Sequence, residues 1–323
     1  MKEKRVTKMS DIAEKKILEN DWAKNIDDLD LRKNFGYYIK IGIVSETTGF
    51  FICRNNEATE ITSEDFENEE RAVVPAQKWR GAERTYLLSE LRKVGGLVPK
   101  NYSRNMVKEK ILLKSPASLI YGDTSTGTGK EMASIASRTF YDWSYSFEPL
   151  SLISTRQTHN SLSDEGTILH DEKGNTLNNA IYNINYIKPG VKFMRYVTME
   201  NSSIEMLQLQ LMAILGTTRY GGRTAILGDN IKNKVIALGF SKGDTTVSSF
   251  TTLKEAWKNG IYLPEKLVEE AMKRNYNKSL MIGTELETLI SNTLALRGNM
   301  EEMHKIGQSL ITKMENDWPE IWR

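Results

Sequence analysis

The sequence predicts an α+β fold, with strand patterns and helix patterns mixed along one chain. Some segments alternate apolar and polar residues with a period of two, and others repeat apolar residues every three or four positions. Hydrophobic residues make up 39% of the 323 residues and charged residues 27%, which is the balance of a globular protein with a sizeable core. No internal repeat is visible, and the length allows one large domain or two ordinary ones.

The first elements lie within the N-terminal hundred residues. Residues 1–33 are polar and predict a helical lead-in. Tyr37–Val44 alternates apolar with polar or small residues, which predicts a strand. Thr59–Glu70 is acidic, and we expect a loop there. Glu83–Val94 predicts a helix because its apolar residues recur at i, i+4 and i+7, and the glycine pair at 95–96 would end it.

The middle of the chain predicts further strands and an insertion. Ser118–Tyr121 and Met132–Phe147 are expected to be strands, and the second is rich in aromatic residues. Residues 154–190 are polar and contain several turn signals. We therefore expect an inserted hairpin or lobe in this segment.

The last third predicts the close of a sheet and appended helices. Val191–Met199 is expected to be a strand, and Ser203 can cap the helix that follows it. Ala225–Leu227 and Val235–Phe240 would complete the sheet. Pro264 stands well at a helix start, so we expect helices from there to the end.

The element order is strand, helix, strands, strand, helix, strand, with helices appended. This order suits an RRM-like (ferredoxin-like) core with inserted lobes. The expected parts are a helical lead-in at 1–34, the first half of the core with a basic loop-helix segment at 35–153, an inserted hairpin at 154–190, the second half of the core at 191–245 and a C-terminal helical part at 246–323.

The positive charge is concentrated in one segment, although the net charge is only +2. Residues 1–70 carry 11 basic and 16 acidic residues, whereas 71–114 carry 11 basic and only 3 acidic ones. Such a segment can neutralise phosphates of a nucleic acid. A solvated helix face with a flanking loop would have the same composition. The cations of the segment are Arg71, Lys78, Arg80, Arg84, Arg92, Lys93, Lys100, Arg104, Lys108, Lys110 and Lys114.

The single cysteine excludes an intramolecular disulfide and makes a structural zinc site unexpected. Cys53 and the three histidines, His159, His170 and His304, fit no usual zinc spacing. The N-terminus does not resemble a signal peptide, and no apolar run is long enough to span a membrane. We expect a cytoplasmic protein with no cofactor and no membrane contact.

The stretch Gly122–Glu131 resembles a P-loop but lacks two of its required residues. Position 124 is threonine where the motif needs glycine, and position 131 is glutamate where a hydroxyl should reach Mg²⁺. A glycine-rich turn between two strands is the better interpretation, and an NTPase is not expected.

Three stretches together resemble one known family. They are Val73–Arg84, which leads into a helix; Thr158–Asn160 with Asp164–Thr167 and Asn183–Gly190; and Ile214–Thr224. In this order and spacing they resemble the Cas-seven-type crRNA-binding backbone subunit of the type I-D CRISPR interference (Cascade) complex. The resemblance covers about residues 35–240, and its most specific part is the Arg-Tyr-Gly stretch at 219–221.

This resemblance implies a scaffold rather than an enzyme. Copies of the chain would polymerise along one crRNA, hold its backbone and leave the spacer free to pair with a target DNA strand. A finger-like hairpin would reach the next copy and flip out bases at intervals. Other partners would be the large, small and repeat-handle-binding subunits. Related members have a zinc-binding lobe, which we do not carry over to this chain.

The expected RNA contacts fall in the first and third stretches and suit recognition without base specificity. Lys78, Arg80 and Arg84 stand at a loop-to-helix junction, where cations and backbone N–H groups can meet a phosphate. Gly81 would let the RNA backbone approach closely. Trp79 could stack on a base, and core packing is its equally good alternative. Further candidates are Arg219, Tyr220, Gly221 and Arg223, for which a salt bridge or a sheet-edge turn is the alternative.

The inserted hairpin contributes the remaining candidates. Arg156 and His159 stand at its base, although a lone histidine is more often a satisfied polar group. Ile168 and Leu169 could form an apolar wedge at the fingertip. Packing within the lobe explains these two nearly as well.

Two other functions stay open from the sequence. A metal-dependent nuclease could cut the paired target strand at regular intervals, and the carboxylates available for it are Asp123, Asp164, Glu165 and Asp171. None of them forms a paired-carboxylate motif, and turn chemistry is the alternative. An RNA-binding protein outside CRISPR is the other possibility.

Overall fold

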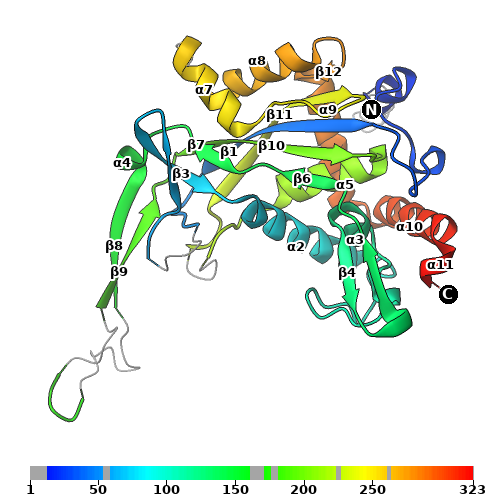
Figure 1. Cartoon of the computed structure of the whole chain (residues 1–323), viewed down its shortest axis with the longest axis horizontal. Coiled ribbons are helices and arrows are strands. Elements are labelled where there is room, and N and C mark those ends of the chain that lie inside the picture. Colours follow the sequence, from blue (N-terminus) through cyan, green and yellow to red (C-terminus); the bar gives the residue numbers. More distant parts are fainter. Residues whose placement is uncertain are drawn as a thin grey trace.

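A large antiparallel sheet runs through the molecule (Figure 1). The structure is a computed structural model, and it describes residues 13–53, 59–160, 171–175, 181–222, 227–259 and 263–322. Within these residues the sheet has eight strands in the order β12-β11-β1-β10-β7-β3-β2, and β6 also pairs with β10. The strands are β1 (Tyr38–Thr47), β2 (Ser63–Phe66), β3 (Glu69–Val74), β6 (Thr139–Tyr141), β7 (Ser144–Ser146), β10 (Lys192–Glu200), β11 (Ile231–Ser241) and β12 (Leu280–Met281).

Helices cover both faces of the sheet (Figure 1). Ile39, Ile41 and Ile43 of β1 point into the larger core, because alternate residues of a strand face one side. That core is completed by α2 (Ala76–Val94), α3 (Pro116–Tyr121), α5 (Ile204–Gly216), α9 (Gly283–Ala295) and α10 (Met300–Asp317). The opposite face packs against α7 (Ser249–Asn259) and α8 (Pro264–Tyr276), and Gly42 of β1 leaves room there for Val268.

Two strand pairs stand apart from the sheet (Figure 1). β4 (Asp123–Thr126) and β5 (Met132–Ile135) form a small lobe beyond α2 and α3. β8 (Ser154–Asn160) and β9 (Ile181–Ile187) form a hairpin that projects at one end. The remaining short elements are α4 (Leu150–Ile153), α11 (Pro319–Trp322) and the 3₁₀ turns η1 (Ile26–Asp28), η2 (Lys110–Leu113), η3 (Gly129–Glu131) and η4 (Leu296–Gly298).

The fold class is the predicted α+β, but several expected elements differ. Thr59–Glu70 is not a loop: it includes β2, the tight turn at Glu67 and Asn68, whose φ angles are 47° and 69°, and the first two residues of β3. Asparagine tolerates this conformation well, which suits a two-residue hairpin turn. Ser118–Tyr121 is not a strand but the end of α3, because Ser115 caps the helix through the N–H of Ser118.

Other boundaries also shift. The expected strand at Met132–Phe147 is three short strands, β5, β6 and β7. The helix expected from Glu83 begins at Ala76, and α2 ends before Gly95, whose φ is 78°. Residues 13–19 of the lead-in are helical. The expected strand at 225–227 lies, except for Leu227, outside the described residues.

Cys53 belongs to a third, smaller apolar cluster beside the β8–β9 hairpin. Its side chain is 1% exposed and packs in the cluster that includes Phe51, Trp79 and Phe193. Burial raises the pKa of its thiol to about 12. None of the helices in the described ranges combines the length and apolar character needed to cross a membrane.

Candidate nucleic-acid interface

A buried polar network joins α2 to the turn that follows α5. The Glu83 carboxylate is completely buried and accepts hydrogen bonds from Arg195 at 2.7 Å, Tyr220 at 2.9 Å and Tyr141 at 2.6 Å. The Arg195 guanidinium also lies over the Trp79 ring, 4.4 Å from its centroid. Such a network rigidifies the groups it joins when every charge is paired. It therefore fixes the position of the 217–222 turn on the side of α2.

Protonation states in this network follow from burial and from the Glu83 charge. Burial and the neighbouring carboxylate raise the pKa values of Tyr141 and Tyr220, so both hydroxyls stay protonated and donate. Burial alone would lower the pKa of Arg195, but the Glu83 carboxylate outweighs it and the pKa is raised. Arg195 therefore keeps its positive charge despite its burial.

The turn itself depends on a glycine. Gly221 has a φ of 81°, and a Cβ atom at this position would lie 2.2 Å from the carbonyl oxygen of Ile52. Only glycine allows both the conformation and the close approach. Asn230 holds the preceding residue by accepting from the Tyr220 N–H and donating to the Tyr220 carbonyl, at 3.0 and 2.9 Å.

A surface cleft lies between this turn and α2. Its volume is about 540 Å³, and it brings together Lys78 and Gly81 from the first predicted stretch with Arg219 and Gly221 from the third. The full lining is Gln77, Lys78, Gly81, Ala82, Thr85, Arg219, Gly221 and Gly222. Two stretches about 140 residues apart in the sequence thus form one site, and its charged side chains are both cations.

The cations of the cleft are accessible. Lys78 is exposed on the first turn of α2. Arg219 pairs with Asp229 at 2.9 Å, but the two side chains are 66% and 64% exposed. Exposed pairs of this kind contribute little, so Arg219 can exchange the carboxylate for a phosphate. The α2 residues that line the cleft run from Gln77 to Thr85, so the cleft follows one side of the N-terminal half of this helix.

Arg104 is a further cation at this cleft. It donates to the Gly81 carbonyl at 3.1 Å and to the Thr85 hydroxyl at 3.2 Å. A Cβ atom on Gly81 would lie 3.5 Å from the Arg104 guanidinium, which is an ordinary van der Waals contact, so the contact with Arg104 does not require glycine here. Sequence reasoning counted Arg104 among the basic residues of 71–114 but did not select it. Its place beside Gly81 is visible only in three dimensions.

Several predicted contact residues are structural. Trp79 is fully buried and donates to Ser144 Oγ at 2.7 Å, so core packing is the alternative that holds and base stacking is wrong. Arg84 is buried and pairs with Asp123 at 2.6 Å. Arg80 is half-buried and donates to the Tyr121 carbonyl. Tyr220 is 1% exposed, which places its ring beneath the cleft rather than in it.

The hairpin candidates have mixed positions. Arg156 is exposed on β8. His159 already has partners within the hairpin, as the alternative interpretation expected. Its Nε2 lies 3.0 Å from the Tyr186 hydroxyl, and its ring stacks on Tyr182. The predicted wedge, Ile168 and Leu169, lies outside the described residues, as does Arg223.

Backbone contacts place the hairpin base beside the cleft. The Gly222 N–H donates to the Ile52 carbonyl at 3.3 Å. The adjacent Phe51 exchanges backbone hydrogen bonds with Ile187 of β9 at 3.0 and 2.7 Å. A ligand in the cleft would therefore run close to the β8–β9 hairpin.

The carboxylates considered for catalysis are engaged elsewhere or not described. Asp123 accepts from Tyr102 and Ser118 as well as Arg84. Asp171 accepts the N–H groups of Lys173 and Asn175, which is ordinary turn chemistry. Asp164 and Glu165 lie outside the described residues. In the part of the chain that the structure describes, no three His, Cys, Asp or Glu side chains are placed to hold a metal ion.

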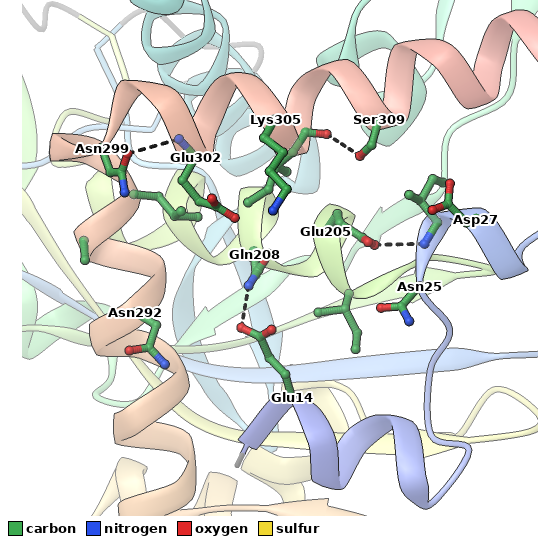
Figure 2. Close-up of a pocket in the computed structure, with 15 residues that line it drawn as sticks. Glu14, Asn25, Asp27, Glu205, Gln208, Asn292, Asn299, Glu302, Lys305 and Ser309 are labelled. Atoms are coloured by element: carbon green, nitrogen blue, oxygen red, sulfur yellow. Dashed lines mark hydrogen bonds between the residues drawn. The ribbon is translucent and has the colours of Figure 1, made fainter. Parts of the chain in front are cut away.

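A second cavity of about 610 Å³ has the opposite charge (Figure 2). Glu14, Asp27, Glu205 and Glu302 line it, and Lys305 is the one cation of its described lining. Figure 2 shows the hydrogen bonds from Gln208 to Glu14 and from the Ile26 N–H to Glu205, at 2.8 and 3.0 Å. Carboxylates repel phosphates, so the smaller cationic cleft is the better candidate for a nucleic acid.

The comparison with family models identifies one family, and solved structures share the fold. The family model described as Csc2 Crispr matches residues 29–315. The crystal structure of Csc2 from Thermofilum pendens is similar to this chain with a TM-score of 0.58 at 13% identity, covering 92% of this chain and 94% of that one. At this identity the similarity shows a shared fold.

Chains from CRISPR complexes are also similar. A chain of a CRISPR RNA-guided surveillance complex in a pre-nicking state has a TM-score of 0.48 at 11% identity, covering 81% of this chain and all of that one (100%). A chain of a type IV-B CRISPR complex has a TM-score of 0.39 at 9% identity, with coverage of 61% and 90%. No curated protein matches. Since the family model spans most of the sequence, the chain belongs to the Csc2 family of CRISPR proteins.

Proposed function

We propose that this chain is a backbone subunit of a type I-D CRISPR interference complex that holds crRNA by its sugar-phosphate backbone. The observation that supports the proposal most is the cleft in which Lys78 and Arg219 meet. Exposed cations bind phosphates without reading bases, and glycines allow a nucleic-acid backbone to approach closely. A subunit that accepts any spacer needs that kind of contact.

The arrangement of the sheet is consistent with an RRM-like core for this subunit. The strands β11, β1, β10 and β6 are neighbours in that order, and α2 and α5 pack on one face. A βαββαβ unit of the ferredoxin-like kind has such an order. In this proposal the cleft lies at the start of the first helix of that unit.

An RNA-binding measurement tests the proposal. We expect K78A/R219A to bind single-stranded RNA of any sequence about tenfold more weakly or worse, because two phosphate contacts are lost. The slope of log K against log salt should fall in magnitude by about 1.4, from about 0.7 per phosphate on a single strand. Filter binding or anisotropy over a salt series, with several unrelated RNA sequences, gives both quantities.

The matched control removes two exposed lysines elsewhere. K15A/K273A changes the net charge equally, and both residues take part only in exposed helical pairs. Its affinity and salt slope should stay near those of the unchanged chain. A K78A/R219A defect confined to one RNA sequence, or an unchanged salt slope, would contradict backbone binding in this cleft.

The same proposal names the partners. Several copies would lie along one crRNA in the cytoplasm, together with large, small and repeat-handle-binding subunits, and the spacer would pair with a target DNA strand. The nucleic acid that copurifies with the chain distinguishes this from RNA binding outside CRISPR. A discrete RNA of repeat-plus-spacer length is the expected result, and a broad mixture of cellular RNA would count against it.

We further propose that the chain binds and does not cut. Asp123 and Asp171 already accept hydrogen bonds from protein groups, so neither is poised for metal-dependent hydrolysis. Incubation of the assembled complex with the complementary target strand and Mg²⁺ should leave that strand intact on a denaturing gel. Products at regular spacing would instead assign a nuclease function.

A further inference from the structure

The free edge of the large sheet is acidic. β2 is the terminal strand in the sheet order, and it pairs on one side with β3. Glu64, Asp65 and Glu70, which we call the acidic edge, are exposed on this hairpin. None of the three forms an ion pair within the described residues. α4 packs on β3, the strand next to β2, and its Leu152 is 66% exposed.

The β4–β5 lobe carries the complementary chemistry. Met106 and Met132 are 69% and 71% exposed, which makes them the two most exposed large apolar side chains of the described residues. Lys108 and Lys130 are exposed next to them in sequence, and neither forms an ion pair within the described ranges. We call these four residues the lobe tip.

Backbone contacts bring the lobe tip together. The Thr126 N–H donates to the Val107 carbonyl at 2.8 Å, and Thr126 is the register partner of Met132. The segment around 106–108 thus lies beside β4, and β5 lies on the other side of β4. The lobe tip is one surface rather than scattered side chains.

This combination fits a protein partner better than a nucleic acid. A phosphate backbone would pair with the two lysines but leave two methionine side chains in water. Exposed methionines are typical of surfaces that pack on a partner. A partner with carboxylates beside an apolar side chain would cover both, and the acidic edge with Leu152 has that composition.

We infer that the acidic edge of one copy docks on the lobe tip of the next copy. β3 and α4 lie toward one end of the long axis, and β4 lies toward the other (Figure 1). Because the two surfaces differ, the contact is heterologous and can repeat from copy to copy. The inference rests on the proposed function, in which copies line one RNA, and it names the surfaces that meet.

Charge reversal tests the contact. K108E/K130E makes the lobe tip acidic, and E64K/D65K makes the acidic edge basic, so each variant alone should repel its own copies. We expect each to assemble on a long single-stranded RNA with cooperativity lowered about tenfold or more. A short RNA that accommodates one copy should bind E64K/D65K at least as well as the unchanged chain. Sedimentation velocity on both RNAs gives the number of copies bound.

A mixture of the two variants is the decisive sample. In it every acidic lobe tip can meet a basic edge, and every acidic edge a basic lobe tip, so alternating assembly on long RNA should return. K15E/K266E, which reverses two exposed lysines elsewhere, serves as the control: alone it should assemble like the unchanged chain, and it should not restore assembly of either variant. Assembly of both variants like the unchanged chain, or a mixture no better than its parts, would overturn the inference.

Failure of the proposed function is read separately. The same chains are sedimented without RNA at rising concentration. If the unchanged chain binds neither RNA, the proposed function fails. The contact between copies is then tested by self-association of the chain without RNA. Self-association that the reversals remove and the mixture restores supports the contact, and equal behaviour of all chains refutes it.

Discussion

An E83A variant should lose about 3–5 kcal/mol of its free energy of unfolding, because it leaves the Arg195 guanidinium buried without its carboxylate. The two side chains are 0% and 1% exposed, so water cannot replace the lost partner. The hydroxyls of Tyr141 and Tyr220 lose their acceptor as well. Urea or guanidinium unfolding followed by circular dichroism measures the change.

The comparison variant is E269A on α8, whose carboxylate pairs with Lys273 on an exposed helix face. We expect a change within about 0.5 kcal/mol there. Glu83 also holds the 217–222 turn, which carries Arg219. Under conditions in which the E83A chain is still folded, we therefore expect it to bind RNA more weakly. Equal stability of E83A and E269A would contradict the ionic network.

A W79A variant should lose about 3–5 kcal/mol, the usual cost of truncating a buried tryptophan. Its ring packs between Phe51, Phe193 and Tyr220 at centroid distances of 6.2, 6.3 and 4.9 Å and beneath the Arg195 guanidinium. The Ser144 hydroxyl would also lose its donor. Thermal and denaturant unfolding should both report the loss.

RNA binding by W79A separates packing from base stacking. The ring is fully buried, so the folded fraction should keep its intrinsic RNA affinity. K78A, one position away and exposed, should show the reverse pattern: unchanged stability and weaker binding. A stable W79A chain with lost affinity would restore the stacking role that the structure opposes.

The sheet and its inner helices were predictable because their signals are local. Ile39, Ile41 and Ile43 alternate along one strand, and Leu87 and Leu91 repeat along one helix. Short segments gave weaker signals, and the strand predicted at Ser118–Tyr121 is a helix end. Ser118–Tyr121 is too short for periodicity to separate helix from strand, and the Ser-Pro cap before it was the better guide.

The site was predictable as a region but not residue by residue. The excess of basic residues in 71–114 points to the helix that lines the candidate cleft, since Lys78 lines the cleft and Arg104 contacts Gly81 beside it. Composition does not distinguish cations that are buried in ion pairs from cations that are exposed at the cleft. Arg84 lies on the side of α2 that meets a carboxylate 39 residues further along the chain, at Asp123. No local pattern encodes that partner.

The buried thiol of Cys53 makes the chain a convenient frame for site-specific labelling. Thiol reagents attack the thiolate, and Cys53 is 1% exposed with a pKa of about 12, so it should react only when the protein unfolds. It is the single cysteine of the sequence. A second cysteine placed at an exposed position such as 70 or 130 would therefore be the one that reacts with a fluorophore, while Cys53 stays unlabelled. Energy transfer between such labels can report distances between neighbouring copies without first removing a native residue.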